Sequence, residues 1–179
     1  LNFEITKHKQ GAIAWKALNQ NDCFLMDLEG QMESDGNIEY KVTLIAREDA
    51  SVQDVALQTR LASGIGRYMM GLGEKGGYCP NDFSWKWNVE KNQDAVWVGD
   101  VNAGIQIRLY DNKYERPLNT NFYHQKPLHM PVSWCNDGNG GIDIHNTADG
   151  TSINAYSGKR SVKKGDRLYY YFNLALTPF

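Results

Sequence analysis

The chain has 179 residues, of which 41% are hydrophobic and 22% are charged, and its formal net charge at pH 7 is −2. These values are typical of one globular domain with a sizeable core, and they argue against a disordered segment. The slight negative charge and the lack of a long basic run exclude the cationic surface of a nucleic-acid-binding protein. No stretch approaches the roughly 18 consecutive apolar residues of a membrane-spanning helix. We therefore expect neither nucleic acid nor a membrane as a partner.

Apolar residues alternate with polar ones along several segments of the chain. Residues 38–44 show the pattern first, residues 55–61 and 105–109 repeat it, and residues 168–176 keep one apolar row. A period of two residues predicts half-buried antiparallel strands. Residues 52–61 come nearest to a helical pattern, and their Val, Thr and Leu content favours a strand instead. In the last segment we expect Leu168, Tyr170, Phe172, Leu174 and Leu176 to lie on one side, the last four lining the core.

Glycine-containing pairs at 35–36, 137–138, 149–150 and 164–165 mark reversals of the chain, because glycine accepts a positive φ. Residues 64–100 differ, since dense glycine is followed by three tryptophans, and they predict short strands or a long structured loop. The expected fold is all-β, a two-layer antiparallel β-sandwich with little helix. We expect residues 1–179 to form a single domain.

Two short patterns have residue types that also occur in nucleotide-binding and metal-binding motifs. Residues 71–76 match G-x-G-x-x-G, but turn residues follow them, whereas a dinucleotide site needs the first turn of a helix there. His124 and His129 are five residues apart around Pro127, which fits no common metal-ligand spacing. The cysteines at 23, 79 and 135 are three free thiols, or two of them form one bridge. The sequence predicts neither a metal nor a cofactor.

Carboxylates are the first candidates for catalysis. Glu74 with Asp82, or Asp94 with Asp100, could supply the two carboxyl groups that glycosidases use, about 5 Å apart in retaining enzymes. Spacing along the chain does not establish such proximity, and exposed carboxylates in turns are common. The sequence therefore does not support a catalytic pair.

The tryptophans carry more information. Trp85 and Trp87 flank Lys86, so an extended segment places both rings on one side. We expect them to form one surface with Trp97 and residues 71–77, facing either a sugar or a neighbouring domain. The alternative is that the rings fill the core. The candidate residues for carbohydrate binding or a domain interface are Trp85, Trp87, Trp97, Trp134, Asn136, Glu74 and Asp100.

Several segments, taken in order, resemble a known family. They are residues 68–77, 85–87, 96–104, 116–118, 131–134 and 174–178. Together they resemble the β-sandwich region of large bacterial proteins related to glycoside hydrolase family 123, over most of residues 30–179. The resemblance implies a supersandwich of the carbohydrate-binding or mutarotase-like type, and a secreted, periplasmic or cell-surface location.

In that family the sandwich precedes a (β/α)₈ barrel, and the barrel holds an Asp-Glu pair for substrate-assisted cleavage of N-acetylhexosaminides. This chain has no match to that pair, so no catalytic residue is carried over. We expect both chain ends to be cuts through a longer polypeptide, with the catalytic barrel as the partner.

Three hypotheses about function follow. The first is a non-catalytic accessory module that packs against the barrel and also contacts carbohydrate. The second is an independent carbohydrate-binding module that uses exposed tryptophans, and the third, for which support is weakest, is a self-contained glycosidase. A large exposed apolar patch would favour the first, and an exposed aromatic row the second. Convergent carboxylates in a deep pocket would favour the third.

Overall fold

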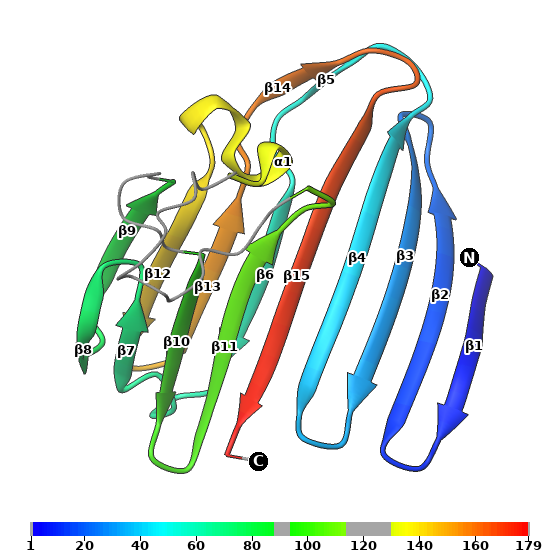
Figure 1. Ribbon diagram of the computed structural model, residues 1–179. Helices are drawn as coiled ribbons and strands as arrows, with labels where there is room; N and C mark the ends of the chain where they lie inside the picture. Colours follow the sequence, from blue (N-terminus) through cyan, green and yellow to red (C-terminus); the bar gives the residue numbers. More distant parts are fainter. Residues whose placement is uncertain (1, 88–93, 114–129, 179) are drawn as a thin grey trace, which may run out of the picture.

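A computed structural model describes residues 2–87, 94–113 and 130–178 (Figure 1). The resembling segment at 116–118 and the histidines at 124 and 129 lie outside these ranges. Strands make up about two thirds of the described chain, and its helical segments are α1 (Val132–Cys135) and a 3₁₀ turn (Asn136–Gly138). No helix in the described ranges is long and apolar enough to cross a membrane. The expected all-β fold with little helix is confirmed.

The larger of two main sheets has nine antiparallel strands, in the order β1-β2-β3-β4-β15-β11-β10-β7-β8. The strands, in that order, are β1 (Asn2–Lys9), β2 (Ala12–Gln20), β3 (Phe24–Glu33), β4 (Asn37–Ala46), β15 (Arg167–Thr177), β11 (Ala103–Tyr110), β10 (Ala95–Asp100), β7 (Tyr68–Gly71) and β8 (Glu74–Tyr78). The last strand of the chain thus joins the N-terminal strands to the middle ones.

The smaller sheet has four strands in the order β6-β13-β12-β9 and forms the second layer. Its strands are β6 (Ala56–Leu61), β13 (Gly150–Tyr156), β12 (Gly141–Thr147) and β9 (Asp82–Lys86), and a separate pair joins β5 (Ala50–Val52) to β14 (Arg160–Val162). Figure 1 shows the smaller sheet behind β11, β10 and β7, whereas β1–β3 extend beyond it as a single layer of described residues.

The core lies between the two sheets. Val98 and Ile107 of the larger sheet face Ile144 and Ile153 of the smaller one, and all four are almost fully buried. Within the described ranges, β4 reaches this core with two half-buried residues, and β1, β2 and β3 contribute none. The core therefore occupies only one half of the large sheet.

The apolar row predicted at residues 168–176 forms the core side of β15. Tyr170 is buried, and Leu168, Phe172 and Leu174 pack against the core. The prediction is wrong for Leu176, which is 42% exposed. It lies near the end of β15, which extends past the strands of the smaller sheet (Figure 1), so that no second layer of described strands covers it there.

The glycine-rich segment forms the tight hairpin between β7 and β8. Gly71, Leu72 and Gly73 all have positive φ, at 105°, 51° and 98°. The strand β8 follows, and not a helix, so the context that a dinucleotide site requires is missing. The pairs at 35–36 and 149–150 join neighbouring strands as expected, whereas residues 137–138 lie in the 3₁₀ turn.

Candidate functional site

Three of the four candidate tryptophans lie in the core. The rings of Trp85 and Trp87 meet edge to face with centroids 4.9 Å apart, so they do share one side, and they are 7% and 8% exposed. Trp134 is 1% exposed, its Nε1 donates to the carbonyl oxygen of Tyr171 at 3.0 Å, and its ring meets Tyr170. No broad ring face is left for a sugar. The expected surface of residues 71–77 with these rings does not form, because burial in the core removes their large apolar area from water.

Trp97 is the exception, because it lies in β10 on the side of the large sheet that faces away from the smaller sheet. Its indole covers Gly99 and Gly104, and a Cβ at Gly104 would lie 2.7 Å from Cζ2 of the ring. Its Nε1 donates to Oγ1 of Thr177 at 3.1 Å. The two glycines thus allow the ring to lie against the backbone of β10 and β11.

The remaining candidates are Asn136, Asp100 and Glu74, of which the first two form hydrogen bonds with the backbone. The amide of Asn136 donates to the carbonyl oxygens of residues 157–159 at 2.8, 3.4 and 3.0 Å, which ties α1 to the chain after β13. Asp100 accepts the N–H of Val101 at 2.7 Å in the turn between β10 and β11. Glu74 begins β8 and is exposed. These three residues lie apart and form no common site.

The carboxylates considered for catalysis have other partners. Asp94 pairs with Nε of Arg108 at 3.4 Å, and Asp82 contacts Nδ1 of His145 at 2.7 Å on the exposed surface of the smaller sheet. In the part of the chain that the structure describes, no three His, Cys, Asp or Glu residues are close enough to hold a metal. Cys23, Cys79 and Cys135 are free thiols. Asp82 and Asp94 are thus each engaged with another side chain.

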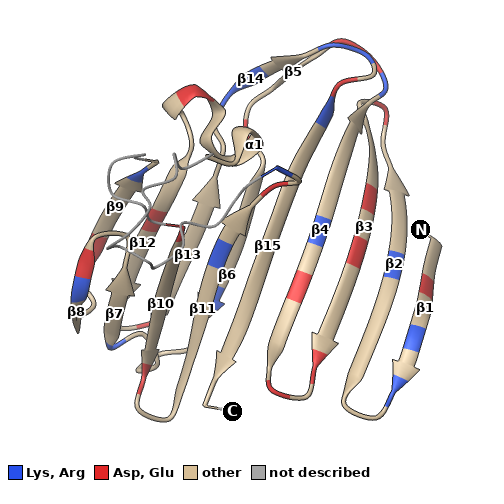
Figure 2. Cartoon of the chain, viewed as in Figure 1, with Lys and Arg blue, Asp and Glu red and all other residues tan. Residues whose placement is uncertain are grey.

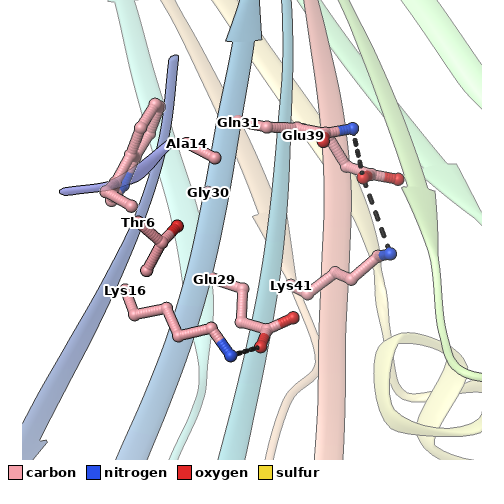
Figure 3. Close-up of a pocket in the computed structure, with 9 residues that line it drawn as sticks. Thr6, Ala14, Lys16, Glu29, Gly30, Gln31, Glu39 and Lys41 are labelled. Atoms are coloured by element: carbon pink, nitrogen blue, oxygen red, sulfur yellow. Dashed lines mark hydrogen bonds and ion pairs between the residues drawn. The ribbon is translucent and has the colours of Figure 1, made fainter. Parts of the chain in front are cut away.

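A shallow hollow lies on the side of the large sheet opposite the core, over β1–β4 (Figure 3). Its lining includes Thr6, Ala14, Lys16, Glu29, Gln31, Glu39 and Lys41. Lys16 pairs with Glu29 at 2.5 Å, and Glu39 accepts from Gln31 at 2.9 Å and lies 3.6 Å from Lys41. Exposed pairs of this kind stabilise a fold only slightly. A general acid or base would need an uncommitted carboxyl group, which this hollow does not offer.

Beside this hollow, the hydroxyl of Tyr110 donates to Oε1 of Glu39 at 2.5 Å. Burial, and then this hydrogen bond, raise the pKa of Tyr110 far above its ordinary value of 10. Above pH 10 the unfolded phenol ionises while the folded one keeps its proton, so the folded state binds more protons and its stability falls as the pH rises.

We expect Tyr110→Phe to flatten this alkaline loss of stability. At pH 7 the variant should lose about 1.5–3 kcal/mol, because the phenol is bonded to a charged acceptor. The deficit relative to the wild type should shrink near pH 11, where the wild type no longer benefits from its neutral phenol. Urea unfolding at the two pH values measures this deficit. A deficit that is equal at both would contradict the proposed role of Tyr110.

The structure also has an exposed apolar surface that contains none of the site residues predicted from the sequence. Directly opposed residues in antiparallel strands point to the same side of a sheet. One such row crosses six strands: Ile5, Trp15, Gly30, Tyr40, Phe172 and Leu109. Leu109 ends the row in the core, whereas Ile5 ends it in solvent with 53% of its surface exposed. The core side of the sheet therefore continues across β1–β4 without a second layer of described residues.

We call this surface the open apolar face. It consists of Phe3, Ile5, Ile13, Trp15, Ala17, Met26, Leu28, Met32, Ile38 and Tyr40, on β1–β4. Trp15 lies over Gly30 and meets Tyr40 edge to face, and Tyr40 stacks on Phe172 with centroids 4.9 Å apart. Aromatic contacts thus connect the open apolar face to the core.

The opposite side of the same strands is polar. The row that runs beside the apolar one begins with Glu4, Lys16, Glu29 and Lys41, which alternate in charge from strand to strand. Figure 2 shows charged residues along β2, β3 and β4, whereas β15 carries one only at its upper end. A sheet that is apolar on one side and charged on the other is built to be covered on the apolar side.

The sequence hypotheses did not include these residues. The alternation at 38–44 predicts one strand of this surface, and residues 13–17 and 24–32 carry the same alternation of apolar and polar residues. Their pattern could have shown an apolar side, although not that the smaller sheet leaves it uncovered.

The sequence matches the family described as "Glycoside hydrolase 123, third domain" over residues 1–178. The chain belongs to glycoside hydrolase family 123. Its position as a third domain also means that the family's proteins contain other domains in the same polypeptide. No curated protein sequence matches this family 123 domain.

Solved structures resemble the domain in fold alone. A putative aldose 1-epimerase from Escherichia coli K12 superposes with a TM-score of 0.53 at 4% identity, covering 99% of this chain and 69% of that one. The heparan sulfate lyase HepC from Pedobacter heparinus gives 0.52 at 6% identity, covering 97% of this chain and 21% of the lyase. The family 123 domain thus spans about a fifth of the lyase. The expected mutarotase-like sandwich is confirmed.

Proposed function

We propose that the chain is a non-catalytic accessory module of a family 123 glycoside hydrolase, and that its open apolar face packs against a neighbouring domain of the same polypeptide. The observation that carries this proposal is the continuation of the core side of the sheet across β1–β4, where no layer from residues 2–87, 94–113 or 130–178 covers it. The setting is carbohydrate metabolism, as the family's name and the titles of the epimerase and the lyase indicate.

The exposed residues of this face favour a permanent contact. Phe3 and Ile5 of β1 and Met32 of β3 are 60%, 53% and 37% exposed and lie on the same side of the sheet. Single exposed apolar residues are common, but a contiguous group with a charged opposite side is typical of an interaction surface.

A domain of the same chain is the occupant that the family description supports. Covalent connection gives a neighbouring domain a high effective concentration at this face, so that a moderate apolar contact suffices to keep it closed. The catalytic barrel is the domain that the resemblance implies for the same polypeptide, and packing against the barrel would let this module support its fold.

Thiol accessibility in the full-length protein tests the contact. Ile5 on the open apolar face and Leu18 on the opposite side of β2 are 53% and 44% exposed in this chain. We expect an Ile5→Cys thiol in the full-length protein to react with a maleimide at least about tenfold more slowly than a Leu18→Cys thiol, because a covered site reacts only when it opens. Mass spectrometry of the two peptides separates these thiols from Cys23.

Three outcomes would count against the proposal. Equal rates at the two positions would show that the face stays open in the full-length protein. Protection that disappears on dilution would assign the face to a second copy of the chain. Turnover of a chromogenic N-acetylhexosaminide by the isolated chain, abolished by replacing one of its own carboxylates, would overturn the non-catalytic role.

A further inference from the structure

A second exposed surface lies at the other end of the large sheet, on its outer side. Tyr78 of β8 is 74% exposed, and its ring stacks on that of Tyr68 in β7 with centroids 5.3 Å apart and an interplanar angle of 28°. Tyr68 lies opposite Gly99 of β10, the residue that the Trp97 indole covers. Three rings thus follow one another across the adjacent strands β8, β7 and β10.

The rings point away from the core. In the same strands, Met69 and Val98 alternate with them and are 2% and 0% exposed on the side of the smaller sheet. Met70, which lies opposite Trp97, is about half exposed. The surface therefore combines flat aromatic area and an exposed thioether at a place where the fold needs neither for its core.

Polar groups lie over and beside the rings. The guanidinium carbon of Arg67 lies 5.3 Å from the Tyr68 centroid and 5.9 Å from the Tyr78 centroid. Gln106 lies opposite Trp97 on β11, on the same side of the sheet. These groups, together with the tyrosine hydroxyls, offer both hydrogen-bond donors and acceptors at the edge of an apolar platform.

We propose that Trp97, Tyr68 and Tyr78 form a binding platform for a saccharide chain, with Arg67 and Gln106 as its hydrogen-bonding edge. A pyranose ring presents a C–H face that is attracted to the negative face of an aromatic ring, and hydroxyls at its rim. Rings on successive strands would contact successive sugar units. This surface is separate from the open apolar face, which lies on the other side and at the other end of the sheet.

A saccharide fits better than a protein partner. Tyr and Trp rings pinned by glycines and by mutual stacking lose little side-chain entropy on binding, which suits a small ligand of limited area. The platform lies on the outer side of the sheet, where the neighbouring strands β11 and β15 carry polar residues, and it does not continue into a wide apolar surface of the kind found on β1–β4.

Hydrogen exchange of the full-length protein tests the platform without interference from other sugar sites, because it resolves individual segments. The probes are chitotetraose, cellotetraose, maltotetraose and a heparan sulfate tetrasaccharide at millimolar concentration. We expect at least one of them to slow exchange in residues 66–79 and 95–106. In Tyr78→Ala the saccharide concentration that gives half of this protection should rise about tenfold, which corresponds to about 1.4 kcal/mol of binding free energy.

The matched control is Leu18→Ala, which removes an exposed apolar side chain from the same side of the sheet at its other end and should leave the protection unchanged. Trp97→Phe keeps the fold and an aromatic ring and should weaken binding by a smaller factor than Tyr78→Ala. No protection with any of the four saccharides would overturn the platform, as would protection that survives Tyr78→Ala. Neither result affects the thiol test of the open apolar face.

Discussion

Replacing Trp134 with alanine is expected to destabilise the domain by about 3–5 kcal/mol, the range for a buried aromatic side chain. Its indole is almost fully buried against Tyr170, and it supplies the donor for the carbonyl oxygen of Tyr171. Removing it leaves a large cavity and an acceptor without that partner, and the two effects add. Urea unfolding followed by circular dichroism measures the loss, because a fluorescence signal would change with the tryptophan itself.

Trp97→Ala provides the matched comparison. Its ring is half-buried on the outer side of the sheet and covers two glycines, so its loss exposes backbone but opens no internal cavity. We expect a cost of about 1–2 kcal/mol, in proportion to the smaller apolar area that it buries. A loss at Trp97 equal to that at Trp134 would mean that both rings are core residues, and it would remove the main ring of the proposed platform.

The tryptophans illustrate what the sequence could predict about the site. Alternation correctly placed Trp85 and Trp87 on one side of a strand, since the side-chain period of a strand is two residues. It could not say whether that side faces the second sheet or solvent. The dense glycine before them predicted short strands or a long structured loop, and the described part of the segment forms short strands, with Trp85 and Trp87 in the core. Trp97 differs because Gly99 and Gly104 lie beneath its ring, a contact between strands that spacing along one strand does not reveal.

The fold was predictable to the level of strands and layers. Alternation at 38–44, 105–109 and 168–176 corresponds to β4, β11 and β15, and the segment 52–61 contains the strand β6 and no helix. The order of the strands was not predictable, because β15 pairs with β4 and β11, which lie far away in the sequence. That long-range pairing carries β1–β4 beyond the smaller sheet and creates the open apolar face.

Apart from Trp97, the residues of both proposed surfaces are not among the candidate site residues predicted from the sequence, and the reason is the same for both surfaces. Tyr68 and Tyr78 flank the glycine-rich hairpin, and only the pairing of β7 with β8 brings their rings together. Trp15 and Tyr40 come from strands that are not neighbours, and Gly30 between them leaves room for the indole. Contacts across strands depend on register, which a single sequence specifies only weakly where turns of several kinds are possible.

Ile107→Ala is expected to cost about 2–5 kcal/mol, as deletions of buried isoleucine do. Ile107 lies in β11 and is 1% exposed, in the centre of the core between the two sheets. The smaller sheet packs against it, so that the removed atoms leave a cavity that the surrounding strands cannot fill without moving.

Ile5→Ala is the matched change on the same side of the same sheet. About half of the surface of Ile5 is exposed in this chain. Its replacement should therefore lower the free energy of unfolding of the isolated domain by less than about 1 kcal/mol, as at most surface positions. In the full-length protein the cost at Ile5 should rise well above that value if a neighbouring domain covers the open apolar face, because alanine would then leave a cavity in the interface. The cost at Ile107 should be the same in both settings. Denaturant unfolding of the two variants, alone and within the full-length protein, therefore measures the contribution of the domain contact, and an unchanged cost at Ile5 would contradict it.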